Sequence, residues 1–361
     1  MPYLFLFVFT VSPLYFIRPQ NVLLKKFEIH YVSIFLIVLI LTLFYGLRYN
    51  VGIDYMSYYN IAELKKYNVP LKGSGELFEP AFRLIYKIVD FFCLPSNTLF
   101  LFGGFIIYAF LFMGVVKFSH SYVLTFFIFF SSGLYFFSFN EFRQFIAVSI
   151  IFFGYRYCVQ RKLFKWSLAV AVACLYHKSA LIAFPMYFLC TVCLRKNIVN
   201  ILIVITLVLK KIGALELLCF VISYIPGYFG NYAQVLPYMV SKGTSGTMGY
   251  IYLVIILIIN NSKYFLRENL KDLFFFNLFI FSAIFINIFG NVYMVIRLME
   301  YFSISLLIVF PNFYFLSKKN KYTYILFLMI CTVFCANLIK YALFSPKENL
   351  LEYHTIFTKW N

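Results

Sequence analysis

The chain has 361 residues, of which 63% are hydrophobic, 23% aromatic and only 12% charged, and its mean hydropathy is +0.87. This composition excludes a water-soluble enzyme and a nucleic-acid-binding protein. The formal net charge of +18 does not alter that conclusion. The basic residues are dispersed, and most lie at the ends of apolar runs, where they set membrane orientation. The sequence therefore predicts one multi-pass membrane domain over residues 1–361.

The apolar runs predict an all-α bundle. A membrane-spanning helix needs about 20 apolar residues, and about twelve runs approach that length. The first is read as a retained helix rather than a cleaved signal peptide. Residues 163–194 are too many for one crossing, and the polar triplet His177-Lys178-Ser179 divides them into two short helices. The predicted spans are 2–17, 29–47, 97–116, 121–139, 141–158, 163–176, 178–194, 197–224, 248–262, 272–290, 292–316 and 322–343.

The basic residues also predict an orientation, because lysine and arginine accumulate in cytoplasmic connections. Every second connection between the predicted spans is rich in basic residues, and these connections together carry 16 of the 31 lysines and arginines. These connections are taken as cytoplasmic, so that both termini lie outside. They contain Arg18, Lys25, Lys26, Lys117, Arg156, Arg161, Lys162, Lys165, Arg195, Lys196, Lys263, Arg267, Lys271, Lys318, Lys319 and Lys321.

Two longer segments fall on the predicted outer side, residues 48–96 and 210–247. The first carries Glu79, Arg83, Lys87 and Asp90 at helical spacing, with Phe82, Ile85, Ile88 and Phe92 on the opposite face. This pattern predicts an amphipathic helix along the outer membrane interface. The second segment is rich in glycine and is predicted to be a loop.

Ionisable residues gather at the outer ends of the predicted spans. A charged side chain costs about 2.5–3.5 kcal/mol at the centre of a span on insertion scales, and less near an interface. Several such residues on one side therefore indicate a functional site. They are Arg48, Asp54, Glu141, Arg143, His177, Lys178, Arg297 and Glu300.

Arg143 carries the strongest of these signals. It falls in the first turn of the span 141–158, where the helix dipole disfavours a cation by about 0.3–1 kcal/mol. An anion held by the guanidinium and by backbone N–H groups explains the position. A salt bridge to Glu141 or an interfacial anchor is the alternative, and Ser138 with Glu141 matches a capping box.

His177 is the candidate base, because imidazole accepts a proton near neutral pH. Its alternative is a satisfied polar group at a helix break. Tyr55 follows Asp54 in the first outer segment, and its ring suits either the membrane surface or a sugar face. Arg297 and Glu300 have the spacing of a local ion pair.

Several motifs are absent from the sequence. There is no DxD, HExxH, P-loop or GxSxG pattern, and Cys190 with Cys193 has no second pair or nearby histidine to complete a metal site. The sequence contains only 13 carboxylates. We therefore predict no metal and no cofactor.

The order of four motifs resembles the EpsG-type polysaccharide polymerase family, whose relatives are the Wzy-like O-antigen and capsule polymerases. The resemblance covers about residues 40–310. The motifs are Arg48-x5-Asp54-Tyr55, Phe142-Arg143-Gln144-x2-Ala147, Tyr176-His177-Lys178-Ser179-Ala180 and Arg297-x3-Tyr301-Phe302.

The resemblance implies polymerisation of polyprenyl-diphosphate-linked oligosaccharide units on the outer face of the bacterial cytoplasmic membrane. The implied partners are that lipid-linked donor, membrane lipid, a flippase and a chain-length regulator. An exporter of lipid-linked glycans and a membrane O-acyltransferase remain alternatives. The candidate catalytic residues are His177, Arg143, Asp54 and Glu141; the candidate substrate-binding residues are Arg48, Tyr55, Arg83, Gln144, Lys178 and Arg297.

Overall fold

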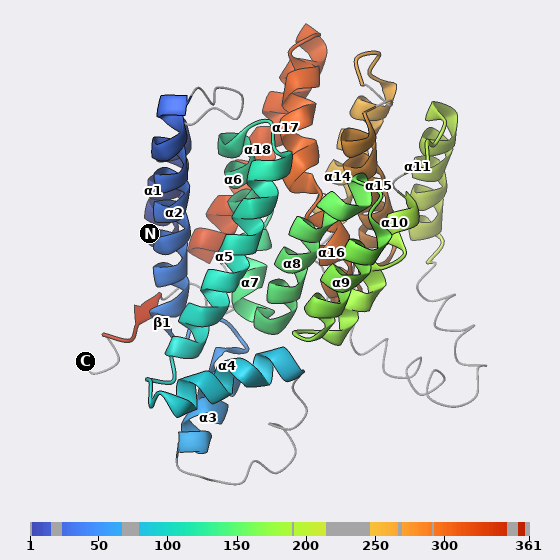
Figure 1. Cartoon of the computed structure of the whole chain (residues 1–361). Helices are drawn as coiled ribbons and strands as arrows, with labels where there is room; N and C mark the ends of the chain where they lie inside the picture. The colour runs from blue at the N-terminus through green and yellow to red at the C-terminus, as the bar shows by residue number, and fades with distance from the viewer. Residues whose placement is uncertain are drawn as a thin grey trace, which may run out of the picture. The chain divides into compact units, whose positions relative to one another are not determined.

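The computed structural model describes residues 2–15, 24–66, 79–189, 191–213, 246–265, 269–290, 292–344 and 353–357. In this described part the chain is all-α except for one short antiparallel pair, Arg48–Tyr49 (β1) with His354–Thr355 (β2) (Figure 1). The chain divides into two compact units, Met1–Phe184 with Cys331–Asn361, and Pro185–Ile330.

The first unit is built around two helices, Thr98–Phe118 (α5) and Phe142–Val159 (α8), that pack along each other. Leu24–Gly46 (α2) packs on the other side of α5. The remaining helices of this unit are Pro2–Tyr15 (α1), Tyr55–Lys66 (α3), Pro80–Phe91 (α4), Tyr122–Ser131 (α6), Leu134–Asn140 (α7), Leu163–Cys174 (α9), the 3₁₀ helix Lys178–Ala183 (η1) and the last part of Lys321–Phe344 (α18).

Two adjacent glycines allow α2 and α8 to approach α5 closely. A Cβ atom on Gly103 would lie 2.1 Å from the Phe142 ring of α8, and one on Gly104 would lie 2.8 Å from the Tyr45 ring of α2. Small residues at helix interfaces are the usual means of close packing in membranes, where apolar side chains gain little by leaving lipid. The sequence of α5 thus determines how closely the rings of its two neighbours approach it.

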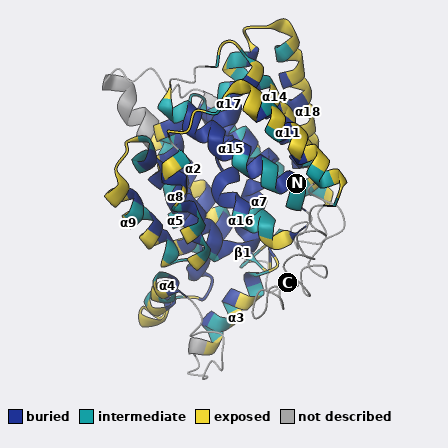
Figure 2. Cartoon of the chain, turned by 90° about the vertical axis from the view of Figure 1, so that its right-hand side faces the viewer, coloured by how far each residue is buried: buried dark blue, intermediate teal, exposed yellow. Residues whose placement is uncertain are grey.

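The predicted amphipathic helix is confirmed as α4. It buries Phe82, Ile85, Tyr86 and Val89 and exposes its opposite side (Figure 2). Both views place α3 and α4 at one end of α2, α5 and α8, with α4 running across their axes. Of the residues expected on the apolar face, Phe82 and Ile85 are buried, Ile88 is half-buried, and Phe92, which follows the last helical residue, is 63% exposed.

In the second unit, Leu270–Phe289 (α15) is the central helix. It packs against Met186–Leu189 (α10), Lys196–Lys211 (α11), Gly246–Asn261 (α14), Tyr293–Ser303 (α16) and Leu306–Ser317 (α17). The Asn269 side chain accepts hydrogen bonds from the N–H groups of Lys271 and Asp272 and so caps the first turn of α15. Asn277 donates to the carbonyl oxygens of Leu189 and Val192, which holds the segment after α10 against α15.

The predicted count of about twelve spans is not confirmed. Among the described residues, three helices are long and apolar enough to cross a membrane, namely α5, α15 and α18. The number rises to five if each of two bent helix pairs is one span, α6 with α7 at 53° and α16 with α17 at 59°. Further apolar helices are shorter, at 10–17 residues.

The helix break predicted at His177-Lys178-Ser179 is confirmed, since α9 ends at Cys174 and η1 begins at Lys178. The bends at 132–133 and 304–305 were not expected from the sequence, which predicted unbroken spans over 121–139 and 292–316. Most of the predicted second outer loop, residues 214–245, lies outside the described residues, as do residues 67–78 of the first.

Candidate functional site

A cluster of rings supports the start of α8. Phe142, the first residue of that helix, contacts Tyr58 of α3, Phe82 of α4 and Phe100 of α5, with ring centres 5.3–5.5 Å apart. Tyr58 and Phe82 also meet edge to face at 5.5 Å. These rings join four helices at one point and fix the direction in which the next residue, Arg143, points.

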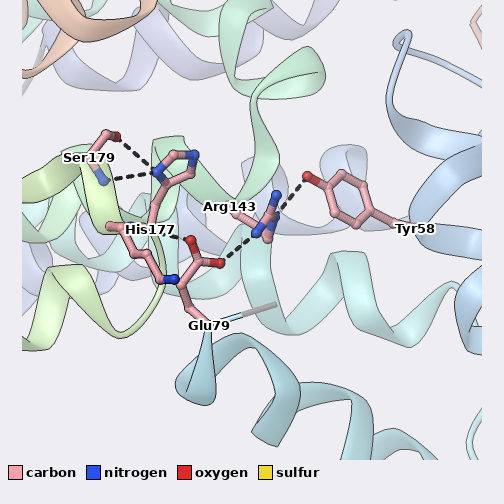
Figure 3. Close-up of polar contacts among 6 residues, drawn as sticks. Tyr58, Glu79, Arg143, His177 and Ser179 are labelled. Carbon is pink, nitrogen blue, oxygen red and sulfur yellow. Dashed lines mark hydrogen bonds and ion pairs between the residues drawn. The ribbon is translucent and has the colours of Figure 1, made fainter. Parts of the chain in front are cut away.

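Arg143 lies in the first turn of α8, as predicted, and its side chain is 22% exposed. Its Nη1 is 2.5 Å from Oε2 of Glu79, and its Nε–H donates to the Tyr58 hydroxyl at 3.2 Å. Figure 3 shows the guanidinium between these two groups. The carboxylate offsets the unfavourable placement of a cation at a helix N-terminus. The ion pair that the structure shows is with Glu79, a partner that the sequence analysis did not consider.

Glu79 is a residue of this site that sequence analysis missed. It directly precedes Pro80, which favours the extended backbone observed at φ −61° and ψ 151° and begins α4. Its side chain does not cap α4. Instead the carboxylate accepts from Arg143 through Oε2 and from the backbone N–H of Lys178 through Oε1, at 3.3 Å. The side chain is only 7% exposed.

His177 is the N-cap residue of η1. Its Nδ1 accepts a hydrogen bond from the Ser179 N–H at 3.3 Å and lies 2.8 Å from the Ser179 Oγ (Figure 3). An Nδ1 that accepts from an amide carries no proton, so the proton of the neutral ring lies on Nε2. The Ala81 N–H donates to the Leu175 carbonyl at 3.0 Å, which ties the start of α4 to the turn before His177.

Arg48 lies in a different environment, with no exposed surface. Its guanidinium carbon is 3.7 Å from the centre of the Tyr45 ring and 4.3 Å from that of Phe139. Its Nη2 donates to the Phe139 carbonyl at 3.5 Å, near the C-terminus of α7. Nε and Nη1 have no hydrogen-bond acceptor in the part of the chain that the structure describes. The faces of the Tyr45 and Phe139 rings thus contact the guanidinium where hydrogen-bond acceptors would otherwise be needed.

The segment after Arg48 is held against the junction of α7 and α8. Gly52 adopts φ +97°, and a Cβ there would lie 2.7 Å from the Phe139 carbonyl oxygen. The Ile53 N–H donates to Oδ1 of Asn140 at 2.9 Å. Ser138 lies inside α7 and donates to the Tyr135 carbonyl. The alternative interpretation of Ser138 and Glu141 as a capping box is therefore wrong, because Ser138 is not an N-cap residue and Glu141, the N-cap of α8, makes no side-chain capping bond.

The remaining candidate residues are distributed unevenly. Tyr55 is fully buried and stacks on Phe100 at 4.3 Å, and burial raises the pKa of Tyr55 above its usual range. Asp54 is half-buried in the turn before α3, while Glu141 and Gln144 are buried. Arg83 is half-buried on α4, and Lys178 is exposed.

Burial also raises the pKa of the Tyr86 hydroxyl on α4 well above its usual range. This hydroxyl donates to the Tyr58 carbonyl at 3.1 Å. This bond holds α3 against α4 and so supports the hydroxyl that Tyr58 offers to Arg143.

The structure thus brings Arg143, His177 and Lys178 together with the unpredicted Glu79 and Tyr58. Arg297 belongs to the second unit, on α16, where its guanidinium carbon lies 5.5 Å from the Tyr293 ring centre. Within the described residues, no group of three or more histidine, cysteine or acidic side chains is arranged to hold a metal ion. Metal independence stays a prediction.

The sequence model of the EpsG family matches residues 31–355, which is nearly the whole chain. The protein belongs to the EpsG family. The match includes Arg48, Glu79, Arg143, His177 and Arg297, and it extends to β2. No curated protein and no solved structure matches this chain.

Membership of the EpsG family indicates a polysaccharide polymerase-type role, and hence a glycosyltransferase-like enzyme. Together with the apolar helices, it indicates a membrane protein. The resemblance drawn from the four sequence motifs is therefore confirmed at the level of the family.

Proposed function

We propose that this EpsG protein joins polyprenyl-diphosphate-linked oligosaccharide units into an O-antigen, capsule or exopolysaccharide on the outer face of the bacterial cytoplasmic membrane. The observation that carries the proposal is the partly exposed Arg143 guanidinium, held by Glu79 and Tyr58 beside the His177–Ser179 pair. This arrangement joins an anion-binding group to a proton acceptor, which are the two functions the reaction needs.

The anion-binding half of the site is the set of donors that converge on Glu79. The Arg143 guanidinium and the Lys178 N–H both bond to this one carboxylate. The diphosphate of the donor offers the same kind of oxygen acceptor with more negative charge. We infer that the diphosphate displaces the Glu79 carboxylate and accepts hydrogen bonds from Arg143 and the Lys178 N–H. Its greater negative charge strengthens the charge-assisted bond to arginine, which is among the strongest kinds of bond in proteins.

In the reaction an acceptor hydroxyl oxygen attacks the anomeric carbon of the donor sugar. The bond between that carbon and the diphosphate oxygen breaks, and the diphosphate lipid leaves with the electron pair. Arg143 stabilises the charge that grows on the leaving group, a contribution that is often the largest in catalysis. The energy of the donor bond drives the step, so that no cofactor is required, and Arg143 fills the charge-stabilising role that a metal would otherwise have.

His177 is the proposed base for the acceptor hydroxyl. Its Nδ1 faces Ser179, so a proton from the acceptor reaches Nδ1 through the Ser179 hydroxyl, which passes its own proton to the ring over 2.8 Å. Asp54 and Glu141 are the rival bases, and the structure adds Glu79 to them. Glu141 is 1% exposed and Asp54 is half-buried. Tyr55, Arg83, Gln144, Lys178 and Arg297 stay candidate substrate-binding residues, whereas we infer a structural role for Arg48, which has no exposed surface. The donor, membrane lipid, a flippase and a chain-length regulator are the proposed partners.

Analysis of lipid-linked glycans in a deletion strain tests this function. Loss of a polymerase leaves single lipid-linked units on the outer face, whereas loss of an exporter leaves them inside. Loss of an O-acyltransferase leaves a full-length unmodified polymer, and loss of a ligase leaves long chains on the carrier lipid. Accumulation of anything but single outer units contradicts the proposal.

The outer location of the site has its own test. Single cysteines replace the exposed Ser57 of α3 and the half-buried Ser179 in a variant that lacks the native cysteines. A membrane-impermeant maleimide is expected to label both in intact cells, provided the outer membrane, where present, is permeabilised. A cysteine at the exposed Lys165 position, predicted to be cytoplasmic, is the control and should react only after lysis. The reverse pattern would overturn the predicted orientation.

A further inference from the structure

The second unit contains a cavity of about 560 Å³, remote in sequence from the Arg143 cluster. It lies between the end of α14, the turn that follows it, the end of α17 and the start of α18. Its apolar wall includes Leu257, Phe313 and Leu316, and its polar wall includes Asn261, Lys263 and Asn320. The volume is in the usual range for a small-molecule site, about 300–1,000 Å³. A ligand that fits both walls must itself be amphipathic.

Basic residues lie in and around the polar side of the cavity. Lys263 lines it, and the exposed Lys318, Lys319 and Lys321 lie at the junction of α17 and α18 next to Asn320. The described segments that form the cavity, 257–265 and 313–324, contain no aspartate or glutamate. These lysines therefore create a positive potential without an acidic counterpart on the same segments, and they favour a negatively charged ligand.

The polar rim is held in place by an asparagine network. Asn260 donates from Nδ2 to the Lys196 carbonyl at 2.9 Å and to Oδ1 of Asn200 at 2.8 Å. The neighbouring Asn261, which lines the cavity, donates to Oδ1 of Asn200 at 3.2 Å. The end of α14 is thus fixed to the start of α11, so the rim is largely formed before a ligand binds.

We propose that this cavity binds an anionic phospholipid. The phosphate group lies at Lys263 and the polar rim, and the beginning of an acyl chain lies along Leu257, Phe313 and Leu316. Basic pockets between membrane helices bind anionic headgroups in this way, particularly on the cytoplasmic side. The lysines around the cavity belong to connections that the sequence predicts to be cytoplasmic. The proposal does not depend on the reaction proposed for the Arg143 site.

Native mass spectrometry of the purified full-length protein tests the proposal, with phosphatidylglycerol and phosphatidylcholine of identical acyl chains as probes. We expect phosphatidylglycerol to bind at least tenfold more tightly. Lys263→Ala should weaken that binding about fivefold, the equivalent of about 1 kcal/mol. In Leu257→Trp the larger side chain fills the space along the apolar wall. This variant should show no preference for phosphatidylglycerol over phosphatidylcholine. Lys165→Ala, at an exposed lysine of the other unit, is the matched control and should bind normally.

Three results would overturn the proposal. Equal retention of the two lipids would show that the headgroup charge is not recognised. An equal loss in Lys165→Ala and Lys263→Ala would indicate attraction to the basic surface in general. Inorganic phosphate that displaces phosphatidylglycerol at equimolar concentration would indicate a free-anion site without an acyl-chain subsite. Thermal unfolding of each variant, with a midpoint within about 2 °C of the parent, excludes misfolding as the cause.

Discussion

Two arginines of the same unit, Arg48 and Arg143, occupy opposite kinds of environment. Arg48 has no exposed surface and lies against the rings of Tyr45 and Phe139, with one carbonyl acceptor. Arg143 is 22% exposed and is held by a carboxylate and a hydroxyl. The groups that contact Arg48 belong to the packed core. The groups that contact Arg143 are oxygen atoms, which a substrate anion can replace.

The difference indicates which cation is available for chemistry. Removal of Arg48 leaves aromatic faces and a buried carbonyl without their partner, which is a loss of packing and cation–π energy. Removal of Arg143 leaves the Glu79 carboxylate, 7% exposed, without its cation. Because Arg143 is partly exposed whereas Arg48 is not, we expect substitutions of Arg48 to act on stability, and substitutions of Arg143 to act on activity with a further loss of stability from the unpaired Glu79.

The largest effect is expected from Arg143. Arg143→Ala should leave only single repeat units, because nothing else in the cluster supplies a guanidinium. Arg143→Lys keeps the charge but loses the planar fork. One lost charge-assisted bond of about 1.5–3 kcal/mol slows transfer roughly 10- to 150-fold. Gel analysis of the surface polysaccharide beside an immunoblot measures both variants. Arg161→Lys, on an exposed arginine, is the control, and a full-length ladder in Arg143→Lys would restrict Arg143 to supplying charge.

A loss of polymer comparable to that of Arg143→Ala is expected from His177, whose ring is both a helix cap and the proposed base. His177→Asn separates these roles, because asparagine is a favoured N-cap residue but a poor base. Loss of general-base catalysis typically slows a reaction about 10²- to 10⁴-fold. We expect His177→Asn and His177→Ala to be equally inactive, with the asparagine variant the more stable of the two in thermal unfolding.

Normal polymer from the asparagine variant and none from the alanine variant would assign His177 a capping role alone. The base would then be Asp54, Glu141 or Glu79. Abundance measured on an immunoblot ensures that only folded protein is compared.

An intermediate effect, on stability rather than on rate, is expected from Arg48→Met. Methionine fills the space but provides no cation, and desolvated cation–π contacts contribute about 2 kcal/mol or more. The midpoint of thermal unfolding in detergent should fall by several degrees, while the transfer rate per folded molecule stays within about twofold. A stable Arg48→Met protein without activity would show that Arg48 contacts the substrate, as its sequence motif first indicated.

The smallest effect is expected from Glu79→Gln. Glutamine keeps an oxygen for the Lys178 N–H but removes the charge that competes with the diphosphate for Arg143. The KM for the donor should fall about fivefold, equivalent to about 1 kcal/mol, with kcat unchanged. Initial rates over a range of donor concentrations separate the two parameters. A large fall in kcat at constant KM would instead make Glu79 the base.

Local sequence patterns were sufficient for much of the fold. Apolar runs identified the main helices, and the polar triplet at 177–179 identified the break between α9 and η1. The alternation of charged and apolar residues identified α4, although the buried face also includes Tyr86 and Val89, which the pattern did not select. Arg143 and His177 were selected because a cation in a first turn and a polar residue inside an apolar run are unusual on local grounds alone.

The sequence by itself determined a helical membrane protein of the EpsG family with an Arg143 and His177 motif, because hydropathy and helix-terminal chemistry act over a few residues. Only the tertiary structure decided that Glu79 pairs with Arg143, 64 positions away, and that Arg48 meets Phe139, 91 positions away. It also decided the pairing of β1 with β2 at the far end of the chain. Such partners are selected by how helices pack, and ring contacts at Phe142 and the glycines of α5 fix that packing. No pattern within a single segment encodes them.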